Sequence, residues 1–232
     1  MIVGGSDPPD GAPTNTAEVI DLNAVTPAWK WTASMAFARR HLNLTVLPTG
    51  EVLATGGVRG TTFNDPTKAV YAAELWNPGT GQWTTLSSNA VTRDYHGTAL
   101  LMPDGRVLVA GGSESSGAPN QKNAEIFSPP YLFRGARPTI SSAPATLQYG
   151  QTFRILTADA GSIAKVSLIR LGAVTHAFDQ NGRAMRLAFT KDATGLTVTG
   201  PSSGNIAPPG HYMVFIVNGT DVPSVAKIVK VY

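Results

Sequence analysis

Four histidines are the residues of this chain best suited to chemistry. His41 and His96 each precede an apolar segment of similar sequence, His176 lies in a polar stretch farther along, and His211 opens an apolar run. Imidazole nitrogens bind Zn(II) and other divalent ions, and a bound water with its pKa lowered to about 7 can attack an ester or a phosphotriester. If His96, His176 and either His41 or Asp94 converge, the sequence is compatible with a metal-dependent hydrolase.

Cysteine is absent from the sequence, which removes disulfides, thiolate metal ligands and thiol nucleophiles together. The formal charge of +3 comes from 18 basic and 15 acidic residues without a basic cluster, so no nucleic-acid partner is expected. No apolar stretch approaches the roughly 18 residues that span a bilayer, so no membrane partner is expected either. The first residues lack the basic and apolar regions of a signal peptide, and the sequence leaves the cellular compartment undetermined.

Composition indicates which elements must position the histidines. The 232 residues include 24 glycines, 17 prolines and only 14% charged residues, against about 25% charged residues in typical soluble domains. With 42% hydrophobic residues the chain can bury a core, which excludes intrinsic disorder. Many short strands joined by turns are therefore expected, and the predicted fold class is all-β.

The first half contains an internal repeat. Residues 41–57 and 96–112 both begin with histidine, carry a Pro-x-Gly turn between apolar runs, and end in a glycine pair. Each glycine pair, including the one at residues 4–5, is followed by an Ala-Glu segment with two apolar residues, and Trp31 and Trp83 then close the first two units. A period near 50 residues with these features resembles the kelch repeat of β-propellers.

Residues 1–133 are therefore expected to form a partial kelch-type β-propeller of two to three blades. Complete propellers have about 4–8 blades, so such an arc leaves blade faces open to water and invites association. The chain can be a fragment of a longer one, an oligomer that completes the ring, or a rearranged stack. Its start inside a blade favours a truncated reading frame, and the exposed blade faces favour a homo-oligomer.

The repeat stops in a proline-marked junction, and residues 134–232 follow a different pattern. Alternating apolar residues predict strands near residues 153–156, 165–170, 185–189, 196–198, 212–217 and 226–231. About seven short strands without helix signals are typical of an immunoglobulin-like sandwich. The absence of a cysteine pair excludes an antibody-type domain.

Four motifs spread over nearly the whole chain connect these two halves. They are Arg93-Asp94-Tyr95-His96 with the turn that follows it, residues 124–132, residues 167–176, and residues 209–226. In this order they resemble the carboxyl-terminal half of the galactose oxidase and glyoxal oxidase family of copper-radical oxidases.

The resemblance implies a copper site on the propeller axis. By the family pattern, Tyr95 matches an axial tyrosine, His96 and His176 match the two histidine ligands, and Phe63 matches an aromatic residue lining the substrate pocket. Imidazole and phenolate ligands suit Cu(II) in a tetragonal site. His41 occupies the repeat position of His96, so it can face the axis as a further ligand or support one. Asp94 and Asp179 flank the two matched histidines and can orient an imidazole or act as a general base.

The chain also departs from the family pattern. The family's copper works with a tyrosine cross-linked to cysteine, and that pair and the substrate-binding arginine lie upstream of residue 1 in the family. Three functions remain open: a truncated oxidase-like protein with a remnant metal site and no Tyr-Cys cofactor, a hydrolase using zinc or another divalent metal with a small-molecule substrate, and a non-catalytic interaction module. The family is secreted, although this chain begins without a signal peptide.

Overall fold

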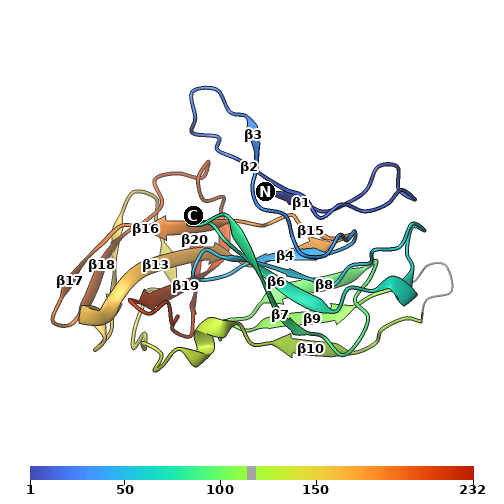
Figure 1. The fold of residues 1–232 in the computed structure, drawn as a ribbon. Helices are drawn as coiled ribbons and strands as arrows, with labels where there is room; N and C mark the ends of the chain where they lie inside the picture. Colours follow the sequence, from blue (N-terminus) through green and yellow to red (C-terminus); the bar gives the residue numbers. More distant parts are fainter. Residues whose placement is uncertain (114–118) are drawn as a thin grey trace.

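The repeated hairpins of the first half fold as three successive antiparallel sheets (Figure 1). The structure is a computed structural model that describes residues 1–113 and 119–232. The first sheet contains β1 (Ile2–Val3), β2 (Ala17–Ile20) and β3 (Trp29–Trp31); the second contains β4 (Asn43–Val46), β5 (Val52–Thr55), β6 (Ala72–Asn77) and β7 (Gln82–Ser88); the third contains β8 (Gly97–Leu101), β9 (Val107–Gly111) and β10 (Ala124–Phe127). The predicted partial propeller is confirmed, with each sheet forming one blade.

Local sequence explains these blades. In both predicted Pro-x-Gly turns the glycine donates its N–H to a carbonyl three residues back, with Gly50 bonded to Leu47 at 2.8 Å and Gly105 bonded to Met102 at 2.9 Å. The glycine pair at the end of β5 allows a close passage of backbone. A Cβ added to Gly56 would lie 2.5 Å from the carbonyl oxygen of Arg93, so only glycine fits there.

Aromatic residues pack between neighbouring blades, as the repeat predicts. Trp83 in β7 packs against a cluster that contains Val3 and Ala17 of the first blade, and its indole N–H donates to the carbonyl of Ala33 at 2.8 Å. The strand register changes which tryptophan of the first blade corresponds to Trp83. Trp83 lies opposite Trp76, and its equivalent opposite Ile20 is Trp29. Trp29, rather than Trp31, therefore holds the repeat position of Trp83.

The second half is a sandwich of two sheets, which confirms the predicted immunoglobulin-like architecture. The larger sheet has the order β11 (Thr146–Leu147), β20 (Lys227–Val231), β19 (Gly210–Asn218), β13 (Ile163–Arg170) and β16 (Ala184–Leu187); the smaller has the order β12 (Thr152–Leu156), β18 (Gly195–Thr199) and β17 (Phe189–Asp192). Ile155, Leu168, Leu196 and Val214 are fully buried between them. A separate two-stranded hairpin consists of β14 (Val174–Thr175) and β15 (Phe178–Asp179).

Three short 3-10 helices join the elements. They are η1 (Pro66–Lys68) between β5 and β6, η2 (Pro130–Phe133) after the last blade, and η3 (Ala160–Ser162) before β13. The predicted division between residues 133 and 134 falls at the end of η2. The described residues contain no helix that is long and apolar enough to cross a membrane.

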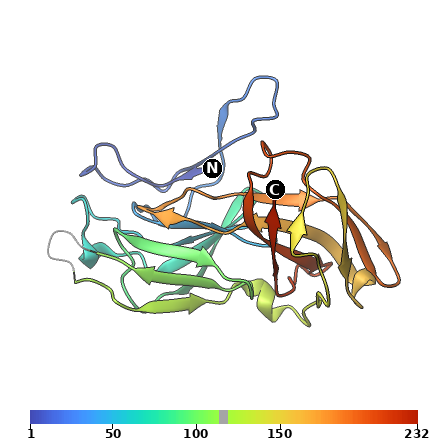
Figure 2. The same ribbon diagram turned by 180° about the vertical axis from the view of Figure 1, so that it is seen from behind.

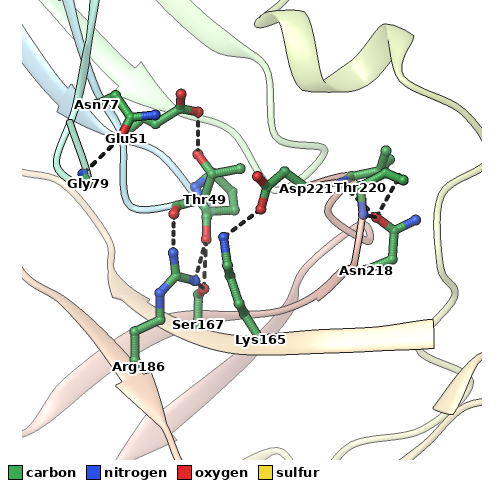
Figure 3. A network of polar contacts seen from close by, with 12 residues as sticks. Thr49, Glu51, Asn77, Gly79, Lys165, Ser167, Arg186, Asn218, Thr220 and Asp221 are labelled. Atoms are coloured by element: carbon green, nitrogen blue, oxygen red, sulfur yellow. Dashed lines mark hydrogen bonds and ion pairs between the residues drawn. The ribbon is translucent and has the colours of Figure 1, made fainter. Parts of the chain in front are cut away.

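The sandwich holds the turn of the second blade through a partly buried polar network (Figure 3). The hydroxyl of Ser167 donates to the carbonyl of Pro48 at 2.7 Å. The guanidinium of Arg186 donates to the same carbonyl at 2.9 Å and also to the carbonyl of Thr49. Two carbonyls that would otherwise be buried without partners are thus satisfied across the junction.

The corresponding turn of the third blade is held in a similar way. The backbone N–H of Ala226, just before β20, donates to the carbonyl of Pro103 at 2.8 Å. The hydroxyl of Tyr131 in η2 donates to the carbonyl of Gly105, and Tyr131 is almost fully buried. These contacts place the sandwich against the ends of two blades, side by side with the propeller segment (Figures 1 and 2).

Candidate metal centre

His96 stands at the start of β8, where the chain reverses into the inner strand of the third blade. Its φ is 64°, a left-handed conformation that costs a non-glycine residue of order 1–3 kcal/mol. The ring Nδ1 lies 3.2 Å from the carbonyl oxygen of Ser113. A carbonyl only accepts, so this contact assigns the proton to Nδ1 and leaves the lone pair on Nε2. The side chain is exposed.

His176 forms the turn of the β14–β15 hairpin. His176 and Ala177 have φ values of 52° and 60°, which close the turn without a glycine. The carboxylate of Asp179 accepts hydrogen bonds from the backbone N–H groups of Ala173 at 2.9 Å and Asn181 at 3.0 Å, so it fixes the hairpin. β14 contacts β8, and β15 contacts β4, which brings this sandwich segment onto the propeller. The Nδ1 of His176 lies 2.7 Å from the hydroxyl of Thr175.

The two imidazoles meet across the junction between the halves. Nε2 of His96 and Nε2 of His176 are 3.3 Å apart, and the ring planes are nearly perpendicular at 87°. This separation is less than twice a metal–imidazole bond length of about 2.0–2.1 Å, so one ion can reach both nitrogens. The contact between the two Nε2 atoms is a hydrogen bond, in which a bound ion would take the place of the shared proton. These donors fit a transition-metal ion that imidazole prefers, copper included.

Tyr95 brings a phenol to the same place. Its ring lies on the ring of His96, with centroids 3.9 Å apart and planes inclined by 32°, and its centroid is 5.7 Å from that of His176. Within residues 1–113 and 119–232 its hydroxyl makes no hydrogen bond. A phenol oxygen without a protein partner is available to an ion beside the imidazoles.

His41 has the same repeat position and the same left-handed backbone as His96, with φ of 60°. Its Nε2, however, lies 2.8 Å from the carbonyl oxygen of Phe63, to which it donates. Burial lowers the pKa of His41, with an opposing contribution from this hydrogen bond, so the imidazole is neutral at pH 7. This hydrogen bond favours a supporting role for His41 over that of a further ligand, the two roles that its repeat position leaves open.

Phe63, which the family resemblance matches to a pocket-lining aromatic residue, packs beside Tyr95 and His41. Its ring meets those of His41 and Tyr95 edge-on, at centroid distances of 4.8 and 4.9 Å. The rings of His41 and Phe63 thus adjoin Tyr95, which in turn contacts both facing imidazoles.

Asp94 does not have the surroundings of a general base. It is 1% exposed, and its Oδ2 accepts a hydrogen bond from the side-chain amide of Asn64 at 3.2 Å. Asn64 in turn accepts from the backbone N–H of Tyr95 at 3.4 Å. The pair supports the backbone of Tyr95, which gives Asp94 a structural contact, and its expected catalytic role stays a prediction. Sequence reasoning missed Asn64, whose one signal was its place beside Phe63.

The described part of the chain contains no group of three or more His, Cys, Asp or Glu side chains arranged to hold a metal ion. The candidate centre is therefore two imidazoles with one phenol, not a three-histidine site. A hollow of about 650 Å³ lies in the sandwich beside β11 and β12 and includes none of these residues.

Comparisons with known proteins identify the ancestry of this arrangement. Residues 10–131 match the family model described as glyoxal oxidase N-terminus, and residues 137–231 match the model described as galactose oxidase-like, early set domain. The chain belongs to the galactose oxidase and glyoxal oxidase family. These are copper-radical oxidases, so the predicted family is confirmed.

Individual members of this family align with nearly the whole chain. A galactose oxidase of Gibberella zeae is 33% identical over 100% of this chain and 35% of its own length. An aldehyde oxidase GLOX of Vitis pseudoreticulata is 33% identical over 88% of this chain and 43% of its own length. The chain thus spans less than half of the length of either relative.

A solved structure supports the same relation. It is described as a novel fungal alcohol oxidase with catalytic diversity among the AA5 family, in complex with copper. The TM-score is 0.91 at 31% sequence identity, covering 99% of this chain and 50% of that one. Galactose oxidase-like proteins of this fold therefore include one that binds copper.

Proposed function

We propose that this chain binds copper through His96, His176 and Tyr95, as part of a galactose-oxidase-like centre. The observation that carries the proposal is the 3.3 Å approach of two Nε2 atoms from separate halves of the chain. Each ring is oriented by a partner at Nδ1, which is how proteins fix metal-ligating histidines. The family relation makes copper the expected ion.

When bound in this family, copper paired with a tyrosyl radical supplies two-electron oxidation of an alcohol or an aldehyde with release of hydrogen peroxide. The residues of this chain supply the surroundings of that chemistry. His96 and His176 present two Nε2 atoms at a fixed separation, and the junction between propeller and sandwich sets that separation. Tyr95 provides an oxygen beside them, and Phe63 limits access from one side.

The 232 residues contain no cysteine, so they cannot form a Tyr-Cys cofactor among themselves. We therefore infer a metal site without its redox partner inside this chain. The copper-loaded chain alone is expected to release no hydrogen peroxide from an alcohol or an aldehyde.

No observation favours a hydrolase, because the group of three ligands that such a site needs does not form in the described residues. Ester hydrolysis is therefore kept only as an alternative activity to be assayed.

Calorimetric titration of the metal-free chain with Cu(II) tests the proposal. We expect one ion per chain, with affinity lowered at least about 100-fold in His96→Ala and in His176→Ala. The matched control is His211→Ala, an exposed histidine of β19, which should change the affinity by less than about 2-fold. Equal losses in all three variants, or no binding by the wild type, would refute the site.

The same samples are assayed for peroxide release and for hydrolysis of a model ester. Peroxide production would overturn the inference that the redox partner is missing. Metal-dependent ester hydrolysis lost in His96→Ala would replace the oxidase-like proposal with the hydrolase.

A further inference from the structure

The segment between β5 and β6 carries Phe63 to the metal centre and is fastened at its base. The backbones of Arg40 and Val58 exchange two hydrogen bonds, of 2.9 and 3.0 Å. The guanidinium of Arg40, which is 3% exposed, donates to the carbonyl of Gly60 at 2.7 Å. Residues 58–70, here called the Phe63 loop, thus start from a fixed point next to His41.

His41 makes the next attachment. Its Nε2–H donates to the carbonyl of Phe63 at 2.8 Å, and its ring is in edge contact with the Phe63 ring. This is a hydrogen bond to the tip of the loop from the residue that follows Arg40. The left-handed φ of His41 turns the imidazole toward the loop.

A third attachment lies on the far side of Phe63. Asn64 is 3% exposed and bridges the carboxylate of Asp94 and the backbone N–H of Tyr95. The Phe63 ring is therefore fixed between His41 and Tyr95 by bonds on both of its flanks. Three rings, those of His41, Phe63 and Tyr95, have mutual centroid distances of 4.8, 4.9 and 5.0 Å.

We propose that His41 is a positioning residue, which holds the Phe63 loop so that Phe63 forms an apolar wall beside the metal ligands. The repeat supports this division of labour: His96 and His41 share a backbone position, and one faces His176 while the other holds the loop. Such a wall favours small alcohols or aldehydes with an apolar side over charged ones. This last consequence rests on the proposed copper site, whereas the attachment itself does not.

Hydrogen exchange of the loop amides tests the attachment without any metal. Arg59 and Lys68 donate backbone hydrogen bonds within the loop, and their peptides are followed by mass spectrometry. In His41→Leu we expect exchange of these amides to accelerate about 10-fold, the value of one lost hydrogen bond. In His41→Gln the side-chain amide can still donate, so less than about 3-fold acceleration is expected. The control His211→Leu should leave the loop unchanged.

Two further measurements separate positioning from general stability. NMR contacts between the rings of Phe63 and Tyr95 should disappear in His41→Leu and persist in His41→Gln. If His41→Leu fails to fold, the proposal is tested on the wild type instead. Nitrogen–proton NMR correlations of His41 show which ring nitrogen carries the proton. A proton on Nε2 supports the proposal, and a proton on Nδ1 overturns it.

Copper titration of the same variants distinguishes this proposal from the previous one. His41→Gln should keep the wild-type affinity within about 3-fold, because His41 is not a ligand. Unchanged loop exchange in His41→Leu refutes the positioning role even if copper binds. Absence of copper binding in the wild type refutes the proposed function while leaving the attachment standing.

Discussion

At the scale of single residues, two histidines at one repeat position differ in function because different partners reach them. His96 and His41 share a left-handed φ, of 64° and 60°, at the start of an inner strand. His96 is oriented by Ser113 and faces His176, whereas His41 faces the carbonyl of Phe63. The repeat predicts where both backbones lie. It does not predict which residue from elsewhere in the chain contacts each imidazole.

Replacement of Tyr95 by phenylalanine isolates the contribution of the phenol. The ring of Tyr95→Phe can keep its contact with His96, and its missing hydroxyl has no partner in residues 1–113 and 119–232. Stability should therefore change by less than about 0.5 kcal/mol. The wild type with Cu(II) should show a phenolate-to-copper absorption band that the variant lacks. Identical visible spectra would exclude Tyr95 as a ligand.

At the scale of elements, the second and third blades each contain a polar network built on an arginine and a glutamate. Arg39 donates to the carbonyls of Gly56 and Ala72 and pairs with Glu74 at 2.5 Å. One repeat later, Arg93 donates to the carbonyls of Gly111 and Asn123 and pairs with Glu125 at 3.0 Å. Each network ties the end of one strand to the middle of the next. The Ala-Glu part of the repeat is therefore explained by hydrogen bonding.

The two networks differ in burial, which gives a matched pair of substitutions. Both side chains of the Arg39–Glu74 pair are fully buried, whereas the side chain of Glu125 is 27% exposed. Glu74→Ala leaves a buried guanidinium unpaired and should cost about 3–5 kcal/mol of unfolding free energy. Glu125→Ala should cost no more than about 2 kcal/mol, because Glu125 is partly exposed and water can take its place beside Arg93. Urea unfolding of both variants measures the difference, and equal costs would show that burial does not set the strength of the network.

Tyr131 links η2 to the third-blade turn, and it makes stability depend on alkaline pH. Burial raises the pKa of Tyr131 well above its usual range, so the folded state keeps the proton that donates to Gly105. The unfolded state loses that proton above pH about 10. Unfolded chains then bind fewer protons than folded ones, and stability should fall by about 1.4 kcal/mol per pH unit from this residue. Below that pH the contribution is fully present.

The pH dependence is measured as a difference between the wild type and Tyr131→Phe. The variant leaves the carbonyl of Gly105 without its buried partner and should lose about 1–3 kcal/mol at pH 7. Between pH 10 and 11 its unfolding free energy should decline less steeply than that of the wild type. Parallel curves for the two proteins would contradict the assignment of this titration to Tyr131.

At the scale of the whole molecule, local signals predicted the blades and the sandwich, and long-range contacts determined the site. Neighbouring residues encode the turns at Gly50 and Gly105 and the alternating strands, so the sequence alone predicts these elements. The bridge from Asn64 to Asp94 and the bond from His41 to Phe63 join segments with no shared pattern. The family resemblance, rather than spacing, indicated that His176 would meet His96. The hairpin that achieves this depends on Asp179, whose carboxylate joins the residues on either side of its base.

The first blade has exposed tryptophans on one face, and we predict that two copies of the chain associate through this face. Trp29, in the position where Trp83 packs against the preceding blade, is 46% exposed, and its neighbour Trp31 is 69% exposed. Glu18 has the repeat position of Glu74 but no arginine partner among residues 1–113 and 119–232. The β2–β3 hairpin that carries these residues stands away from the rest of the molecule (Figure 2). A second copy of this chain can cover the two indoles and remove apolar surface from water.

Sedimentation analysis over a range of protein concentrations measures this association. The wild type should show a concentration-dependent shift from monomer to a larger species, with a blue shift of tryptophan fluorescence as the indoles leave water. The double variant Trp29→Thr/Trp31→Thr should weaken the association at least about 10-fold, since burial of one large apolar side chain is worth roughly 1.5–3 kcal/mol. The control Val25→Thr changes an apolar residue that is fully exposed in the hairpin turn and should leave the association as it is. A wild type that remains monomeric at every concentration would show that this face makes no contact between copies, and the prediction would then be wrong.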